Sequence, residues 1–182
     1  MKYIITEQQY RFLTEDEGEK ILELPGVEYF GSWEVLQKFV EKRGNPLFSI
    51  SGNLNLQETN IKSLGNLESV KAGLNLFESS IESLGNLKYV GGNLDLGRTN
   101  IKSLGNLKEV GGYLDLHNTP IKSLKNLKSV GGSLFLFNSS IESLRNLKFV
   151  GGDLNLRNTP LSYMHTKKEI KEMVKVGGDI YM

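Results

Sequence analysis

Residues 91–110 read GGNLDLGRTNIKSLGNLKEV, and residues 111–130 read GGYLDLHNTPIKSLKNLKSV. The same pattern starts at Ser51 and recurs every 20 residues without a gap to residue 161, which makes six repeats. A fixed period of this length is typical of a solenoid, in which each copy forms one coil and buries its apolar face against its neighbours. The repeat therefore predicts an elongated array rather than a spherical core.

Two apolar patterns follow each other within one repeat. Leu94 and Leu96 alternate with polar residues, as expected of a short strand with one buried face. The next apolar residues recur every three positions, which favours a 3₁₀-like or extended return arm over a long helix. They are Ile101, Leu104, Leu107 and Val110. Paired glycines then allow a tight corner. We expect an α/β solenoid with one parallel sheet of about seven short strands.

Residues 20 positions apart should stack in straight ladders, because parallel strands lie about 4.8 Å apart. One apolar ladder consists of Leu54, Leu74, Leu94, Leu114, Leu134 and Leu154. Polar positions repeat as well: a hydroxyl ladder starts at Thr59, a serine ladder at Ser63 and an asparagine ladder at Asn66. Short polar side chains reach nearby backbone groups, so we expect these ladders to be structural.

The segment Leu94–Ile101, LDLGRTNI, resembles the core of leucine-rich repeats, with Thr99 where that family usually has asparagine. It is similar to short bacterial and viral variants whose copies read V-G-G-x-L-x-L-x-x-T. The resemblance covers residues 51–161. It implies a curved, right-handed solenoid with parallel strands on its concave side. It also implies a surface for binding another protein, without catalysis.

The N-terminal sequence divides into two parts. Residues 1–31 form an extension, in which we expect a strand at Lys2–Ile5 and a helix from Thr6 to about Leu13. Residues 32–50 form a helical cap: Ser32 can cap a helix over Trp33–Arg43, with Gly44 at its end.

The C-terminal cap covers residues 162–182. Thr166 and Glu169 have capping-box spacing. Ile170, Met173 and Val174 form an apolar stripe at helical spacing, so we expect one helix here with these three side chains inward. The end of the chain repeats the glycine-pair entry of earlier strands, which predicts a final strand.

The composition narrows the functional classes. The 182-residue chain has a net charge of +1 and no cysteine, so it has no disulfide and no cysteine-based zinc site. No apolar run reaches the length of a membrane span, and the start lacks a signal-peptide core. We therefore expect a cytoplasmic protein with no membrane partner. Residues 1–10 resemble the starts of tailed-phage proteins, which implies a phage source and a host cytoplasm.

Aromatic residues gather on the strand face that points away from the leucine ladders. Tyr113, His117, Phe135 and Phe137 fall in two adjacent repeats, and exposed aromatic clusters often mark binding sites. The remaining candidates on this face are Phe77, Asp95 and Asp115. We predict that these seven residues bind a protein partner. The alternative is that Phe135 and Phe137 cover each other and shield the strands.

Other chemistries find less support. A carboxylate–carboxylate–imidazole set of Asp95, Asp115 and His117 could hold a divalent metal, but nothing in the sequence predicts supporting residues. A row of four lysines from Lys88 to Lys148 could follow a phosphate backbone, yet no aromatic residues interleave with it. No nucleophile elbow or phosphate-binding loop occurs. We expect no catalytic residue, no metal and no cofactor.

Two functions remain open. The first is a non-catalytic protein that recognises another macromolecule, most readily a protein, through its strand face. The second is a structural component of a virion or of a homo-oligomer, in which the array acts as a spacer.

Overall fold

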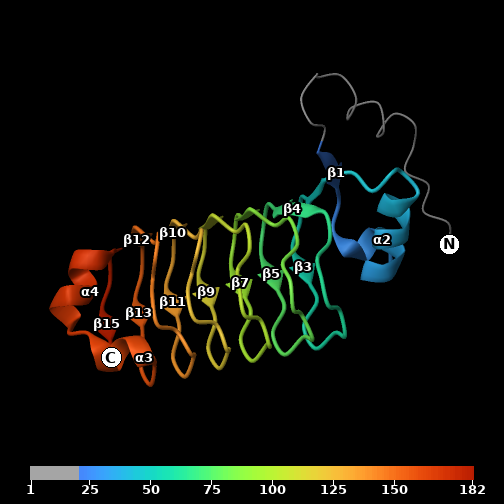
Figure 1. Cartoon of the computed structure of the whole chain (residues 1–182). Coiled ribbons are helices and arrows are strands. Elements are labelled where there is room, and N and C mark those ends of the chain that lie inside the picture. The colour runs from blue at the N-terminus through green and yellow to red at the C-terminus, as the bar shows by residue number, and fades with distance from the viewer. Residues whose placement is uncertain (1–20) are drawn as a thin grey trace.

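The chain forms an elongated solenoid whose coils follow one another from one end to the other (Figure 1). The structure, a computed structural model, describes residues 21–182. The strand expected at Lys2–Ile5 and the helix expected from Thr6 to Leu13 lie outside the described residues.

Each repeat contributes one short strand to each of two parallel sheets. Within residues 21–182, the first sheet has seven strands in the order β15-β13-β11-β9-β7-β5-β3. These strands are β3 (Leu54–Asn55), β5 (Leu74–Asn75), β7 (Leu94–Asp95), β9 (Leu114–Asp115), β11 (Leu134–Phe135), β13 (Leu154–Asn155) and β15 (Ile180–Tyr181). This sheet confirms the strands predicted from the leucine alternation.

The second sheet was not predicted. It has eight strands in the order β1-β2-β4-β6-β8-β10-β12-β14. These are β1 (Leu22–Leu24), β2 (Phe48–Ile50), β4 (Leu67–Val70), β6 (Tyr89–Val90), β8 (Glu109–Val110), β10 (Ser129–Val130), β12 (Phe149–Val150) and β14 (Lys175–Val176). The expectation of one sheet was wrong because the apolar residue in most of these strands, such as Val90 or Val110, ends a run of apolar residues that recur every three positions. That spacing favours a return arm and hides the period of two that reveals a strand.

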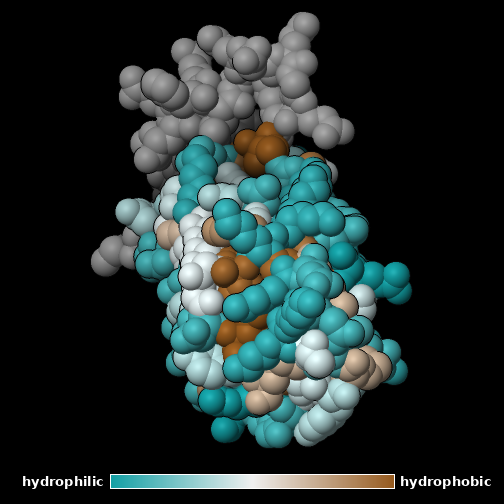
Figure 2. Space-filling view, turned by 90° about the vertical axis from the view of Figure 1, so that its left-hand side faces the viewer, coloured by the Kyte–Doolittle hydropathy of each residue, from teal (hydrophilic) through white to brown (hydrophobic). Residues whose placement is uncertain are grey.

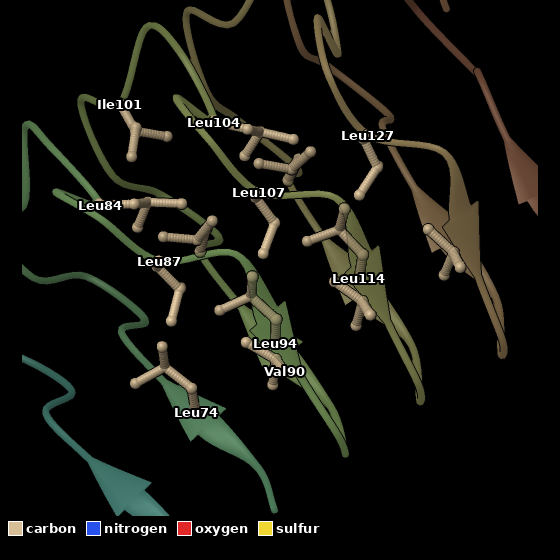
Figure 3. Packing of buried hydrophobic residues seen from close by; sticks show 14 of the residues in the cluster. Leu74, Leu84, Leu87, Val90, Leu94, Ile101, Leu104, Leu107, Leu114 and Leu127 are labelled. Atoms are coloured by element: carbon tan, nitrogen blue, oxygen red, sulfur yellow. The ribbon is translucent and has the colours of Figure 1, made fainter. Parts of the chain in front are cut away.

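The leucine ladders are confirmed by the pairing of the strands. Leu74 pairs with Leu94, and Leu94 pairs with Leu114, so equivalent residues lie in register. Figure 3 shows Leu84, Leu87 and their equivalents in later coils facing the strand leucines across a narrow interior. These side chains are almost completely buried. Each coil therefore buries the apolar side chains of the next one.

Hydroxyl side chains close the corner after each strand of the first sheet. The Oγ1 atom of Thr99 donates a hydrogen bond of 2.7 Å to the carbonyl oxygen of Leu96, and Thr119 does the same to Leu116. Ser83 Oγ accepts a hydrogen bond from the backbone N–H of Gly85. Asn126 Nδ2 donates to the carbonyl oxygen of Gly105 in the preceding coil. Most of these polar side chains are therefore bonded to the backbone, as predicted, whereas Ser79 Oγ and Ser139 Oγ are buried without a hydrogen-bond partner among the described residues.

The N-terminal end carries η1 (Val27–Tyr29), a 3₁₀ turn, and α2 (Trp33–Glu41). Ser32 is the N-cap of α2, because its Oγ accepts from the backbone N–H of Val35 at 3.3 Å. The helix ends two residues before the predicted Arg43, and Gly44 takes the left-handed conformation just beyond it. The residues of α2 that are buried are Trp33, Leu36 and Val40.

The C-terminal end has two helices where one was expected, namely α3 (Pro160–Met164) and α4 (Lys167–Met173). Thr166 and Glu169 form the predicted capping box, and Thr159 forms another with Ser162. The expectation that Met173 points inward was wrong, since it is 42% exposed. Figure 2 looks onto this end and shows apolar side chains surrounded by hydrophilic ones.

In the part of the chain that the structure describes, no helix combines the length and the apolar character needed to cross a membrane.

Candidate functional site

The predicted site residues all lie on the outer side of the seven-stranded sheet. Strand pairing places Asp115 between Asp95 and Phe135, one residue per coil. The corner that follows each strand adds a parallel row. This row contains Phe77, Gly97, His117 and Phe137. All seven predicted residues are partly buried, so each contacts its neighbours and keeps some surface open to a partner.

Three rings of the corner row are stacked. The rings of His117 and Phe137 have centroids 4.9 Å apart and planes 12° from parallel. The ring of Phe77 lies 6.1 Å from that of His117, with 30° between the planes. Gly97 is the residue between Phe77 and His117, and a Cβ atom there would collide with Cε1 of the imidazole. The missing side chain at Gly97 therefore allows the imidazole to lean toward Phe77.

Asp115 holds the imidazole in this position. Its Oδ1 lies 2.8 Å from His117 Nδ1 and also accepts a hydrogen bond of 2.9 Å from the backbone N–H of His117. The His117 side chain is only 13% exposed. One carboxylate oxygen thus fixes both the backbone and the ring, which orients the middle member of the stack.

A second ring pair lies next to the stack. Tyr113 and Phe135 meet edge to face, with centroids 6.2 Å apart and 62° between their planes. This is one of the arrangements that aromatic pairs prefer. We call Tyr113, His117, Phe135 and Phe137 the aromatic patch. Phe135 pairs with Tyr113 and Phe137 with His117, and none of the four is fully buried.

Acidic groups give one side of the patch a negative character. Asp95 Oδ1 accepts a hydrogen bond of 2.9 Å from the backbone N–H of Gly97. Burial raises the pKa of the Asp95 carboxyl, and the neighbouring charge of Asp115 adds to the effect, while the bond from Gly97 and the nearby His117 oppose it. The pKa of Tyr113 is also raised, first by burial and then by Asp95 and Asp115.

The carboxylates of this face already accept hydrogen bonds from neighbouring groups. Within residues 21–182, no group of three or more histidine or acidic side chains is arranged to hold a metal ion. Asp115 Oδ1 already accepts from His117, and Asp95 Oδ1 from Gly97. These carboxylates therefore orient the backbone and the imidazole.

The charged rows pair between coils. Lys62 binds Glu82 at 2.7 Å, and Lys122 binds Glu142 at 3.1 Å. In the lysine row, Lys88 Nζ lies 2.6 Å from Glu68 Oε1. Ion pairs between exposed side chains contribute little stability, so these rows mainly keep the flanks hydrated.

Sequence reasoning missed a hollow beside the aromatic patch. It has a volume of about 240 Å³ and lies over β3, β5 and β7. Its polar and aromatic lining consists of Asn53, Asn55, Asn75, Asn93, Asp95 and Tyr113, with Gly73 on its floor. The signal was present, since Gly73 stands where the other repeats carry asparagine, tyrosine, serine or aspartate. Two exposed rings on the other sheet, Tyr89 and Phe149, were also missed.

No model of a known protein family, no curated protein and no solved structure matches this chain. The functional argument therefore rests on the residues and their geometry.

Proposed function

We propose that this chain is a non-catalytic recognition protein that binds another protein through the aromatic patch on its seven-stranded sheet. The observation that carries the proposal is the stack of His117 on Phe137, held by Asp115 and continued by the Tyr113–Phe135 pair. Aromatic side chains supply much of the binding energy at protein interfaces. Rings that are already held in place lose little conformational freedom on binding.

We further propose that the array is a right-handed solenoid of the leucine-rich-repeat type that acts inside a cell. The L-x-L-x-x-(T/S)-x-I pattern and the absence of cysteine support this assignment. In this proposal α2 and the pair α3 and α4 are caps, since a solenoid exposes apolar side chains unless its terminal coils are covered. The burial of Leu36 and Val40 at one end and of Ile170 at the other supports that role.

The test replaces the two phenylalanines of the patch. A Phe135→Ala/Phe137→Ala variant should lose at least about 90% of a partner captured from host extract, because interface aromatics commonly contribute 2 kcal/mol or more. Phe149→Ala is the matched control, since Phe149 is 38% exposed on the other sheet. The melting temperature of each variant shows whether the fold is retained. Equal capture by the double variant and the parent chain would reject the aromatic patch as the binding site.

The assembly function is the second candidate, and the open edge of β3 favours it. The N–H of Leu54 donates to Gly73, and that of Leu56 donates to Asn75, both toward the interior of the sheet. The intervening Asn55 therefore directs its own N–H and C=O to the opposite side, where no strand pairs with β3 among the described residues. At the other end of the solenoid, Met164 and Met173 are exposed.

Head-to-tail association would cover both ends of the solenoid. Light scattering over a concentration series should then detect dimers or longer chains, and Asn55→Pro should weaken them because it removes an N–H at the open edge. A monomer at every concentration would exclude self-assembly without affecting the proposal for the aromatic patch.

A further inference from the structure

A hollow over Gly73 lies on the strand face, next to the aromatic patch. Residues of four successive repeats line it, and Leu54 and Leu74 are among them. Gly73 provides the space, since the equivalent positions in the neighbouring coils are Asn53 and Asn93. The hollow shares Asp95 and Tyr113 with the predicted site residues, but its other polar side chains lie outside the patch.

The asparagines around the hollow are held by their own oxygen atoms. Asn53 Oδ1 accepts from the backbone N–H of Gly73 at 2.8 Å. Asn93 Oδ1 accepts from Tyr113 at 3.0 Å. Asn55 Oδ1 accepts from Gln57 at 3.2 Å. Because a backbone N–H can only bond to the amide oxygen, these bonds fix which atom of each side-chain amide is the oxygen and which is the nitrogen.

The bound oxygens leave donors available. Among residues 21–182, no hydrogen bond uses the amide N–H₂ groups of Asn53, Asn55 and Asn93. Asp95 adds an acceptor, because its Oδ1 binds Gly97 and its second oxygen has no such bond. The hollow therefore offers fixed donors, one carboxylate acceptor and the ring of Tyr113.

The charge and size of the hollow restrict the ligand. Asp95 is its only ionisable acid or base besides the phenol of Tyr113, so anions are disfavoured and the carboxylate has no second acid to help it bind a metal ion. A volume of about 240 Å³ lies below the range for drug-sized ligands, which is roughly 300–1,000 Å³. The ligand should thus be small, neutral and rich in groups that both donate and accept.

We propose that the hollow binds one ring of a neutral carbohydrate. Sugar hydroxyls donate and accept hydrogen bonds, which matches the asparagine amides and the Asp95 carboxylate. The C–H face of a sugar ring can pack against the aromatic ring of Tyr113. A peptide fits less well, because it presents only one N–H and one C=O per residue along an extended backbone, whereas the donors of three asparagines and the Asp95 carboxylate gather around one small hollow. The proposal shares Tyr113 with the aromatic patch, but it does not require the patch to bind a protein.

The structure suggests a variant that fills the hollow without disturbing the fold. A Cβ atom on Gly73 would lie 3.1 Å from Asn53 Oδ1 and 3.5 Å from the carbonyl oxygen of Asn93, and Gly73 does not need a left-handed backbone. Gly73→Ala therefore adds a methyl group inside the hollow with only a small shift of Asn53. Gly52→Ala is the matched control, since its Cβ would have nothing closer than 3.9 Å and Ala72 occupies the equivalent position in the next coil.

The test is a glycan array probed with the full chain, followed by calorimetric titration of the neutral oligosaccharide that gives the strongest signal. We expect Gly73→Ala and Tyr113→Ala each to weaken binding by about 10-fold or more, and Gly52→Ala and Phe149→Ala to leave it within about 2-fold.

Three outcomes would overturn the proposal. The first is that the parent chain binds no neutral glycan above background. The second is that Gly73→Ala binds the glycan as tightly as the parent chain does. The third is that no glycan binds and that Gly73→Ala fails to bind a protein that the parent chain captures. The last result would assign the hollow to the protein partner. If the Phe135→Ala/Phe137→Ala variant no longer binds the protein partner but still binds the sugar, the two binding sites are distinct.

Discussion

The imidazole of His117 stacks on the ring of Phe137 at 4.9 Å, although the two residues are 20 positions apart in the sequence. The repeat period causes this contact, because it places equivalent corners of adjacent coils beside each other. Asp115 then fixes the orientation of the imidazole through Nδ1. The strand face thus carries aromatic groups that are oriented before any partner arrives.

Removing the carboxylate that holds His117 should disturb the stack. Asp115→Ala leaves Nδ1 and the backbone N–H of His117 without their shared acceptor, and a hydrogen bond of this kind contributes about 1 kcal/mol. We expect binding of the captured partner to weaken by about 5-fold, as measured by surface plasmon resonance. Unchanged affinity, with the parent melting temperature, would show that the orientation of His117 does not matter for binding.

The pKa shift of Asp95 predicts a dependence of stability on pH. Its carboxyl pKa is higher in the folded chain than in the unfolded chain, mainly because of burial. The folded state therefore holds the proton of Asp95 more tightly than the unfolded state does. The free energy of unfolding then falls as the pH rises from the pKa of Asp95 in the unfolded chain through its pKa in the folded chain.

Asp95→Asn should remove this effect and keep the acceptor for Gly97, as Asn75 does for Phe77 in the preceding coil. We expect a higher melting temperature than the parent at pH 7 and no gain at a pH below both pKa values. A gain of the same size at both pH values would contradict burial of the charge as the cause.

Two serines of the hydroxyl ladder are incompletely bonded. Ser79 Oγ and Ser139 Oγ are buried without a partner among the described residues, whereas Thr99 in the next coil donates to Leu96. Ser79→Thr should form the equivalent bond to Leu76 and stabilise the chain by about 1 kcal/mol. Thr99→Ser is the reverse control. Chemical denaturation measures the free energy of unfolding of both variants. If Ser79→Thr is less stable than the parent chain, a threonine at position 79 does not form the bond that Thr99 forms.

Glycine pairs bring adjacent coils together at the corners. A Cβ atom on Gly111 would collide with the carbonyl oxygen of Gly91 in the preceding coil. Gly111→Ala should therefore destabilise the chain by about 2 kcal/mol or more, since tightly packed backbone must move. Gly52→Ala should be close to neutral, because a Cβ atom there would have no neighbour closer than 3.9 Å. Similar free energies of unfolding for the two variants would contradict the close approach of the coils.

The sequence predicted the parts of the fold that depend on the 20-residue period. The pairing of Leu74 with Leu94 and the bond from Thr99 to Leu96 follow from the repeat itself. The second sheet did not follow, because Val90 in the strand Tyr89–Val90 continues a three-residue apolar spacing that favours a return arm. The first C-terminal helix was missed although Thr159 and Ser162 carry its capping signal.

Contacts at the site depend on exceptions to the repeat. Gly97 and Gly73 lack side chains where other copies have them, and these gaps decide where His117 leans and where the hollow forms. An alignment of the repeats shows both exceptions, but only coordinates show which neighbour enters the gap. His117 covers Gly97, whereas the space over Gly73 stays open.

Site-specific photo-crosslinking tests the central proposal most directly. A benzoylphenylalanine placed at Phe137 on the aromatic patch, or at Phe149 on the other sheet, is irradiated in the presence of host extract. The account predicts a crosslinked protein from position 137 and none from position 149. Crosslinking from position 149 alone, or from neither position, would contradict recognition through the aromatic patch.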